Sequence, residues 1–449
     1  MIEKTIDLFF DTVGCILAGS SADGIRELKQ TMGLWAGDGP AKVFSFDERM
    51  SAPSAAFLNS VMGHANDFDD THDSALNHGC VTLVPSLLAV CEMLSAGAGN
   101  SISIRQSGPA LPPVSGKEFI AALAVGLDIS NRLGMAFIPY LHVGWLPTTL
   151  WGPFACAAAC GRFLKLSEEQ MSHAFGLAYS QIHGNRQALV DGALAKRVQP
   201  GFSASAGIQA AFFALSGITA ARRIIGGEFG IPALFTAGRI DGTYLTEELG
   251  RRYETRNISI KPYPSCRCTH PVIDAAMSLK EHRGVQAEKI LSGTVYLPPQ
   301  SMGQIGHPFQ VRDNPTVDAQ FSAPYTAALT FLKGRPGIRD FREETVRASK
   351  PIMELASRFK TVEFESHNSG LAPIEMALRL EGGREERIRI EHPKGSPDNP
   401  LARNELLTKF NDCLDNSVKT ITGEQRVDTS RAIFNVLSFQ DMSKLIDLI

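Results

Sequence analysis

The sequence has little net charge for its length. Among its 449 residues, 44 lysines and arginines nearly balance 47 aspartates and glutamates, which leaves a formal net charge of -3. A chain without a basic surplus has no general means of gripping a phosphate backbone or an anionic lipid surface. We therefore expect no nucleic acid and no membrane as a partner, and a small solute instead.

Cysteine is also sparse, with eight residues that lie mostly in apolar surroundings, where a thiol packs as a small hydrophobe. Cys266 and Cys268 with His270 resemble a metal cluster, but no second cysteine pair accompanies the CxC spacing, which favours structural thiols. The start of the chain carries Glu3 and Lys4 and no signal-peptide pattern, and we find no apolar stretch of membrane-spanning length. These absences predict a reduced, cytoplasmic protein.

The residues that are present predict a mostly α fold. Apolar side chains recur at three- and four-residue spacing through the first 250 residues, and Ser167 with Gln170 forms a capping box. After about residue 255 the pattern changes to strands at 290–297 and a hairpin at 373–393. We expect a large all-helical domain from residues 1–256 and 394–449, and a smaller α/β domain from residues 257–393.

In one stretch, residues 59–85, several titratable residues lie close together in the sequence between two apolar runs. These groups are Asp67, Asp69, Asp70, His72, Asp73 and His78. They could be solvated side chains at a helix end, or a functional site, since buried charges are costly unless they are paired. If the preceding helix continues to Asp70, Asp67 and Thr71 lie one turn apart on one face.

The run Asp69 to Asp73 also matches a DDxxD pattern, which in isoprenoid synthases holds Mg²⁺ against a diphosphate. That function needs a second metal-binding motif on a late helix. Asn411 and Asp412 begin such a motif, but the residues that should follow are absent. We therefore rank this alternative well behind. The chain also lacks a phosphate-binding glycine fingerprint and a GxSxG motif.

Further polar residues stand in suggestive places: Lys196 in GALAKRVQPGFSASAG, Lys261 and His270 in KPYPSCRCTHPVIDAA, and Tyr325 in QFSAPYTAA. Lysines among small and apolar residues are candidates for burial and for binding carboxylate groups. Each of these signals is weak by itself.

Together, the runs GHANDFDDTHD, AKRVQPGFSASAG, KPYPSCRCTHPVIDA, DAQFSAPYTAA and HPKGSPDNPL resemble the MmgE/PrpD family. That family includes 2-methylcitrate dehydratase, cis-aconitate decarboxylase and iminodisuccinate epimerase. The resemblance implies an all-helical domain with a smaller α/β lid, a homodimer, and a small di- or tricarboxylate as substrate.

The resemblance also implies the site residues. They are Asp67, His78, Lys261 and Tyr325 as catalytic groups, and Thr71 and Lys196 as substrate-binding groups. His270, from the same segment as Lys261, is added as a substrate-binding candidate on its sequence context. In this scheme His78, oriented by Asp67 or Thr71, moves the proton. The lysines bind carboxylates, and Tyr325 donates to a leaving hydroxyl or to the enolate. The scheme requires no metal and no cofactor.

One residue departs from the decarboxylase pattern. Where a second histidine precedes proline in that pattern, this chain has Leu146 before Pro147. Leucine cannot shuttle a proton, so a dehydratase is the leading expectation. An epimerase that removes and returns an α-proton, a decarboxylase, and a family member that has lost catalysis stay open as alternatives.

Overall fold

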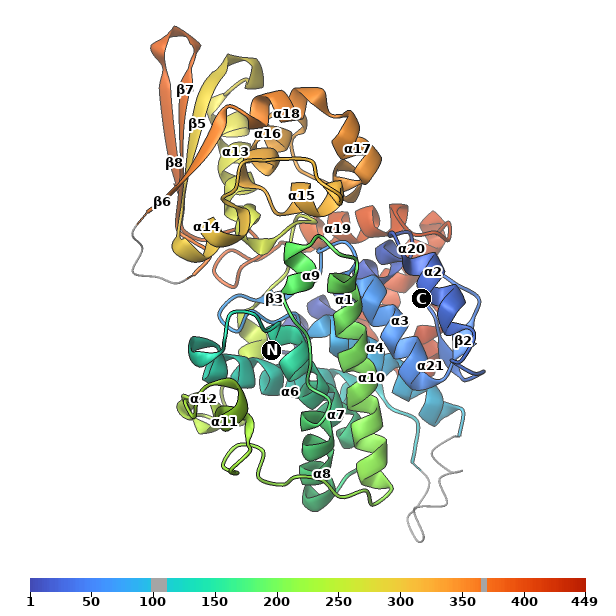
Figure 1. Ribbon diagram of the computed structural model, residues 1–449. Coiled ribbons are helices and arrows are strands. Elements are labelled where there is room, and N and C mark those ends of the chain that lie inside the picture. Colours follow the sequence, from blue (N-terminus) through green and yellow to red (C-terminus); the bar gives the residue numbers. More distant parts are fainter. Residues whose placement is uncertain (98–110, 365–369) are drawn as a thin grey trace. The chain divides into compact units, whose positions relative to one another are not determined.

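The structure is a computed structural model that describes residues 1–97, 111–364 and 370–449 (Figure 1). The chain forms two compact units: unit 1 comprises Met1–Ala65, Asp69–Ile258 and Lys409–Ile449, and unit 2 comprises Asn66–Phe68 and Ser259–Thr408. The chain is mostly helical with one small mixed sheet, which confirms the expected fold class. The domain boundaries expected at residues 257 and 394 stay a prediction.

Unit 1 is built from helices. They are α1 (Ile2–Gly19), α2 (Ile25–Met32), α3 (Ala52–His64), α4 (Cys80–Ser95), α6 (Gly116–Phe137), α7 (Pro147–Phe163), α8 (Glu168–Tyr179), α9 (Gln187–Val190), α10 (Ala195–Leu215), α11 (Ile231–Phe235), α12 (Thr243–Thr246), α20 (Gly423–Phe434) and α21 (Met442–Ile446). Helix α19 (Arg403–Asp415) begins in unit 2 and ends in unit 1. Short strands are β1 (Ala41–Lys42), β2 (Arg49–Met50) and β3 (Thr71–His72).

Helix α10 packs on α7, α3 and α8 at the centre of unit 1. Small residues make the close packing possible, because a Cβ added at Gly207 would lie 2.2 Å from the Cβ of Cys156 on α7. The apolar pattern of this segment begins at Gly201, but the helix itself begins at Ala195. Lys196 therefore lies in the first turn of a long helix and is half-buried.

The C-terminal segment packs against the N-terminal helix. The ring of Phe10 on α1 stacks on Phe410 at 4.0 Å and on Phe434 at 4.5 Å between ring centroids. The Nζ of Lys409 lies 2.6 Å from Oδ1 of Asp11, and both side chains are buried. Residues 409–449 thus complete the helical core around α1, and Figure 1 shows the blue and red helices side by side.

Helix α6 corrects one expectation from the sequence. The stretch Gly116–Tyr140 is 25 residues long and apolar enough to cross a membrane by length and composition, so the expectation that no such stretch exists is wrong. In the structure, 72% of its most apolar window is buried among the surrounding helices. Core helices of globular domains share these properties.

Unit 2 contains a four-stranded sheet in the order β6-β5-β7-β8. Its strands are β5 (Ile290–Leu297), β6 (Phe359–Glu363), β7 (Ile374–Leu380) and β8 (Glu385–Ile390), and its helices are α13 (His270–Arg283), α14 (Pro299–Ile305), α15 (Pro315–Gln320), α16 (Ala323–Lys333), α17 (Glu343–Ala348) and α18 (Lys350–Ala356). Strand β5 runs parallel to β6 and antiparallel to β7, and β7 pairs antiparallel with β8. The expected hairpin is confirmed, with Gly382 and Gly383 at positive φ in its turn. The strand β4 (Ile258–Ser259) precedes this region.

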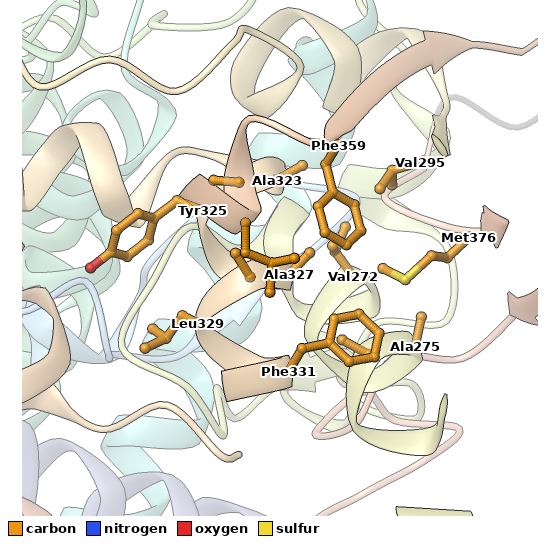
Figure 2. Close-up of a cluster of buried hydrophobic side chains, with 14 of the residues drawn as sticks. Val272, Ala275, Val295, Ala323, Tyr325, Ala327, Leu329, Phe331, Phe359 and Met376 are labelled. Atoms are coloured by element: carbon orange, nitrogen blue, oxygen red, sulfur yellow. The ribbon is translucent and has the colours of Figure 1, made fainter. Parts of the chain in front are cut away.

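The core of unit 2 lies between this sheet and helices α13 and α16 (Figure 2). Val295 and Met376 point from the strands toward Val272 of α13, and Phe331 of α16 stacks with Phe359 of β6. Alternate residues of β7 are buried, as expected for a strand with one covered face. The packing fixes α13, whose first residue is His270.

Candidate acid–base site

The acidic stretch does not continue the preceding helix. Helix α3 ends at His64, and Asp67 has a φ of 51°, in the left-handed region that ends helical periodicity. The expectation that Asp67 and Thr71 share a helix face is therefore wrong. Asp69 and Asp70 are 0% and 1% exposed, so they are not solvated side chains at a helix end.

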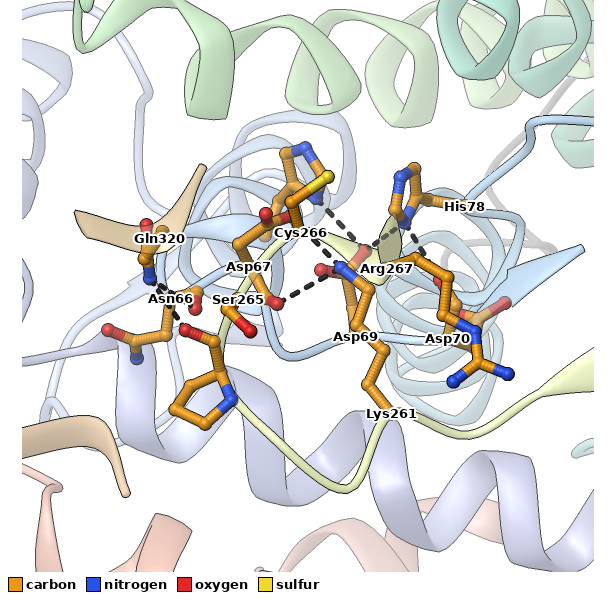
Figure 3. Close-up of polar contacts among 12 residues, drawn as sticks. Asn66, Asp67, Asp69, Asp70, His78, Lys261, Ser265, Cys266, Arg267 and Gln320 are labelled. Atoms are coloured by element: carbon orange, nitrogen blue, oxygen red, sulfur yellow. Dashed lines mark hydrogen bonds and ion pairs between the residues drawn. The ribbon is translucent and has the colours of Figure 1, made fainter. Parts of the chain in front are cut away.

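Asp69 is held between two imidazoles. Its Oδ2 lies 2.9 Å from Nδ1 of His64 and 3.0 Å from Nδ1 of His78, and the two rings are 5.0 Å apart between centroids (Figure 3). Nδ1 of His78 also lies 2.8 Å from the backbone oxygen of Asp70. His64 and Asp69 are buried, whereas 20% of the His78 side chain is exposed. His78 is therefore the member of this cluster that a solute can reach.

Backbone contacts hold His78 in place. Its N–H donates to Oγ1 of Thr148 at 3.0 Å, in the first turn of α7. The neighbouring Asn77 side chain donates to Ser130 and Asn131 of α6. The N–H of Cys80, at the start of α4, donates to the Asp70 carboxyl group. Three helices thus fix the loop that carries the cluster.

Burial and neighbouring charges shift the pKa values of the residues in this cluster. Burial would raise the pKa of Asp69, but the two imidazoles outweigh it and hold this pKa well below its usual range. Burial lowers the pKa of His64 to about 4, despite the attraction of Asp69. Burial and the charge of Asp69 raise the pKa of Asp70 to about 7. At neutral pH the cluster contains a charged Asp69 and a neutral His64.

Lys196 and Thr71, two of the expected substrate-binding residues, lie in unit 1 together with His78. The positive charge of Lys196, in the first turn of α10, is among the influences that lower the pKa of His64. Thr71 is buried in β3. Leu146 precedes α7, two residues before the Thr148 that contacts His78. The charge of Lys196 thus acts on His64, which shares Asp69 with His78.

In unit 2, Lys261 binds Asp67. The Nζ of Lys261 lies 3.0 Å from both the backbone oxygen and Oδ1 of Asp67, and the lysine is 1% exposed (Figure 3). Gln320 of α15 donates to the backbone oxygens of Asn66 and Pro264. These hydrogen bonds fix the two chain segments that carry Asp67 and Lys261. A lysine held at such a depth needs its carboxylate partner to stay charged.

His270 is enclosed by hydrogen bonds. Its Nδ1 lies 3.2 Å from Nη1 of Arg267, and its Nε2 lies 3.2 Å from the backbone oxygen of Ser265. Arg267 can only donate and the carbonyl can only accept, so Nε2 carries the proton and both ring nitrogens are occupied. Burial and the charge of Arg267 hold the pKa of His270 well below its usual range. In this structure His270 braces the 261–267 segment, and its expected substrate-binding role stays a prediction.

Tyr325 lies in the apolar core of unit 2. Its ring packs against Phe309 and Phe341, and its hydroxyl donates to the backbone oxygen of Asp340 at 3.3 Å. Burial raises the pKa of this hydroxyl well above its usual range. The catalytic role expected for Tyr325 stays a prediction.

Three side chains of this cluster carry atoms that could ligate a metal ion. Across the described ranges 1–97, 111–364 and 370–449, His64, Asp69 and His78 are the set whose ligand atoms lie within 4.8 Å of one another. Their mutual hydrogen bonds account for this spacing without an ion. All eight cysteines are buried and none forms a disulfide within the described ranges, which fits the structural thiols expected from the sequence.

The sequence prediction missed two members of this cluster. Asp69 was recognised only as part of the acidic crowd, and His64 was not singled out. A signal existed, because His64 and Asp69 belong to the same GHANDFDD run. The backbone turn at Asp67, which has a positive φ, brings them together. A positive φ at a non-glycine residue is uncommon, so the sequence did not predict this turn.

A partly exposed imidazole held by a buried carboxylate is an arrangement used in acid–base catalysis. The fold and this site define a mostly helical protein with a candidate acid–base centre. The model of the MmgE/PrpD N-terminal domain matches residues 1–241, and that of the C-terminal domain matches residues 263–433. The chain belongs to the MmgE/PrpD family.

Curated relatives match along the whole chain. A cis-aconitate decarboxylase-like protein of Aspergillus oryzae is 25% identical, covering 100% of this chain and 93% of that protein. Cis-aconitate decarboxylases of Aspergillus terreus and Homo sapiens are each 24% identical, covering 100% of this chain and 91% and 90% of those proteins.

Proposed function

We propose that this chain is a lyase acting on a small di- or tricarboxylate, with dehydration of a 2-methylcitrate-like hydroxy acid as its reaction. Family membership and relatives named as decarboxylases support a lyase. The observation that carries the proposal is His78, whose ring is reachable while its Nδ1 is held by Asp69 and Asp70. Lys196 nearby supplies positive charge for a carboxylate group.

In the proposed reaction, the free nitrogen of His78 takes a proton from the carbon next to a substrate carboxylate. The electrons of the C–H bond move onto that carboxylate, which becomes an enediolate. They then form the C=C bond as the hydroxyl leaves the neighbouring carbon with the proton that the His78 imidazolium returns, which releases water and leaves His78 neutral. Lys196 is the proposed cation that stabilises the developing negative charge, and the catalytic role expected for Lys261 stays a prediction. The reaction needs no redox partner.

Proton NMR in D₂O with citrate-like, aconitate-like and aspartate-derived carboxylates tests this proposal. The panel reports water loss, CO₂ loss and deuterium exchange in the same spectra. Dehydration predicts a new alkene signal from a hydroxy acid without loss of carbon. Exchange or epimerisation without an alkene would replace the lyase proposal by the isomerase alternative.

Decarboxylation of cis-aconitate is the second candidate, favoured by the names of the relatives. Leu146 stands two residues before Thr148, which contacts the backbone of His78. We therefore expect Leu146→His to add an imidazole beside the site and to raise CO₂ release from cis-aconitate by about 10²-fold, the lower end of the range for a positioned proton donor. Leu146→Gln, which is polar but cannot shuttle a proton, is the matched control. An unchanged rate in Leu146→His would exclude residue 146 as the position that separates the two reactions.

A further inference from the structure

The hydrogen bonds around His78 decide which ring nitrogen is available for chemistry. Nδ1 faces two acceptors, the backbone oxygen of Asp70 at 2.8 Å and Oδ2 of Asp69 at 3.0 Å. A carbonyl cannot donate, and an ionised carboxylate cannot donate either. Nδ1 must therefore carry the proton, which leaves Nε2 with the lone pair that accepts a substrate proton.

Asp69 needs both imidazoles to keep its charge. The side chain is 0% exposed, and its Oδ2 is the atom that both Nδ1 groups contact. Its Oδ1 is buried without a hydrogen-bond partner among the residues that the structure describes. Two N–H donors thus compensate an ionised group that burial would otherwise neutralise.

His64 binds the same oxygen of Asp69 that the reacting ring binds. It is the last residue of α3 and 2% exposed, so the helix and its packing set the position of the ring. The rings of His64 and His78 meet at 66°, so one carboxylate oxygen can accept from both. Rotation of Asp69 away from His78 would break the His64 contact at the same time.

From this geometry, and on the basis of the proposed function, we infer that Asp69 and His64 are positioning residues for His78. Asp69 holds the Nδ1–H tautomer and stabilises the imidazolium that forms when a substrate C–H proton moves to Nε2. The electrons of the broken C–H bond stay on the substrate, and Asp69 takes no proton. His64 stays neutral and keeps Asp69 in place.

The first test is direct and needs no substrate. Long-range ¹H–¹⁵N NMR of the ring nitrogens distinguishes the two tautomers, and comparison with His78→Gln assigns the His78 signals. At pH 8 the wild type is expected to show the Nδ1–H form. An Nε2–H form in the wild type would overturn the inference, whatever the protein catalyses.

The second test uses turnover of the carboxylate found in the NMR panel. Asp69→Asn removes the charge, and we expect it to lower kcat by about 10²-fold with KM changed less than about threefold, since proton transfer rather than binding is impaired. His64→Asn keeps a donor near the position of Nδ1 and should retain most of kcat, whereas His64→Leu should lose it. Equal kcat in His64→Asn and His64→Leu would overturn the role of His64.

Glu254→Gln is the matched control for a buried carboxylate. Glu254 also holds an imidazole, with Oε2 at 3.3 Å from Nε2 of His72, and both side chains are buried. We expect Glu254→Gln to lower stability but to leave kcat unchanged. A loss of kcat equal to that of Asp69→Asn would show a general effect of breaking such pairs and would contradict a specific positioning role. If the wild type turns over no carboxylate, the proposed function fails, and the tautomer measurement still decides this inference.

Discussion

At the scale of single residues, Asp70 carries a clear electrostatic signature. It is fully buried, and burial together with the charge of Asp69 raises its pKa to about 7. His78 and Asp11 also act on it, and Cys80 donates a backbone N–H to it. At acidic pH the folded protein therefore keeps a neutral carboxyl group beside the charged Asp69.

Asp70→Asn tests this state through the pH dependence of stability. In the unfolded chain an aspartate ionises at a pKa of about 3.9, so between pH 4 and 7 the folded wild type binds more protons than the unfolded chain. The Asp70 contribution to the free energy of unfolding is thus present at low pH and lost as pH rises through 7. We expect Asp70→Asn, a mimic of the neutral acid, to gain stability relative to wild type by up to ~4 kcal/mol between pH 4.5 and pH 8. Urea unfolding at both values measures this gain, and a constant difference between the two proteins would contradict it.

Lys261 and Asp67 form a buried ion pair. Variants of the two residues can separate its contribution to stability from the contribution of Lys261 to activity. Lys261→Met leaves the charge of Asp67 without this partner, which should cost about 3–5 kcal/mol in the free energy of unfolding. The double variant Lys261→Met with Asp67→Asn removes both charges and should recover most of that stability. If Lys261 binds the substrate, kcat/KM should fall at least about 10²-fold in both variants. Recovery of activity in the double variant would show that the lysine is structural.

At the scale of elements, the close approach of α10 to α7 depends on glycine. Gly207→Ala would place a Cβ 2.2 Å from Cys156 Cβ, so the two helices would have to separate. We expect a loss of about 2–3 kcal/mol in the free energy of unfolding, as for other overpacked cores. Gly303→Ala is the matched control, because it lies within α14 and a Cβ there would meet nothing within 4 Å. The control should be neutral or stabilising by up to ~1 kcal/mol, and equal effects in thermal unfolding would contradict the packing argument.

Local patterns predicted the elements well. The strand Ile290–Leu297 and the hairpin about Gly382 were predicted because their side chains alternate between a covered and an exposed face. The capping box of α8 was also confirmed, with Ser167 accepting from the Gln170 N–H and Gln170 accepting in return. Helix starts were less accurate, since α10 extends back to Ala195 through residues that carry no apolar pattern.

The candidate site was less predictable than the elements around it. Crowding of acidic residues and histidines pointed to the correct stretch, and His78 was expected to act. The partner of His78 was not foreseen, because Asp69 reaches it only after the chain turns at Asp67 with a φ of 51°. Tyr325 illustrates the converse, since its sequence context did not reveal that its ring packs within the apolar core of unit 2.

At the scale of the whole molecule, two compact units carry different parts of the expected chemistry. Unit 1 holds His64, Asp69, His78 and Lys196, and unit 2 holds Lys261 with Asp67. Both domain models of the family match, one to each of the two halves of the sequence. A homodimer, expected from the resemblance, stays a prediction, and sedimentation of the purified chain would test it.

The central claim is that His78 moves the substrate proton of a carboxylate lyase. Its most direct test is alkene formation from the responsive carboxylate by wild type, His78→Gln and His142→Gln. His142 is exposed, and its Nδ1 accepts from the N–H of Gly144, so His142→Gln controls for loss of an imidazole. We predict wild-type rates for His142→Gln and a loss of at least about 10²-fold for His78→Gln. Alkene formation by His78→Gln at the wild-type rate would contradict the account.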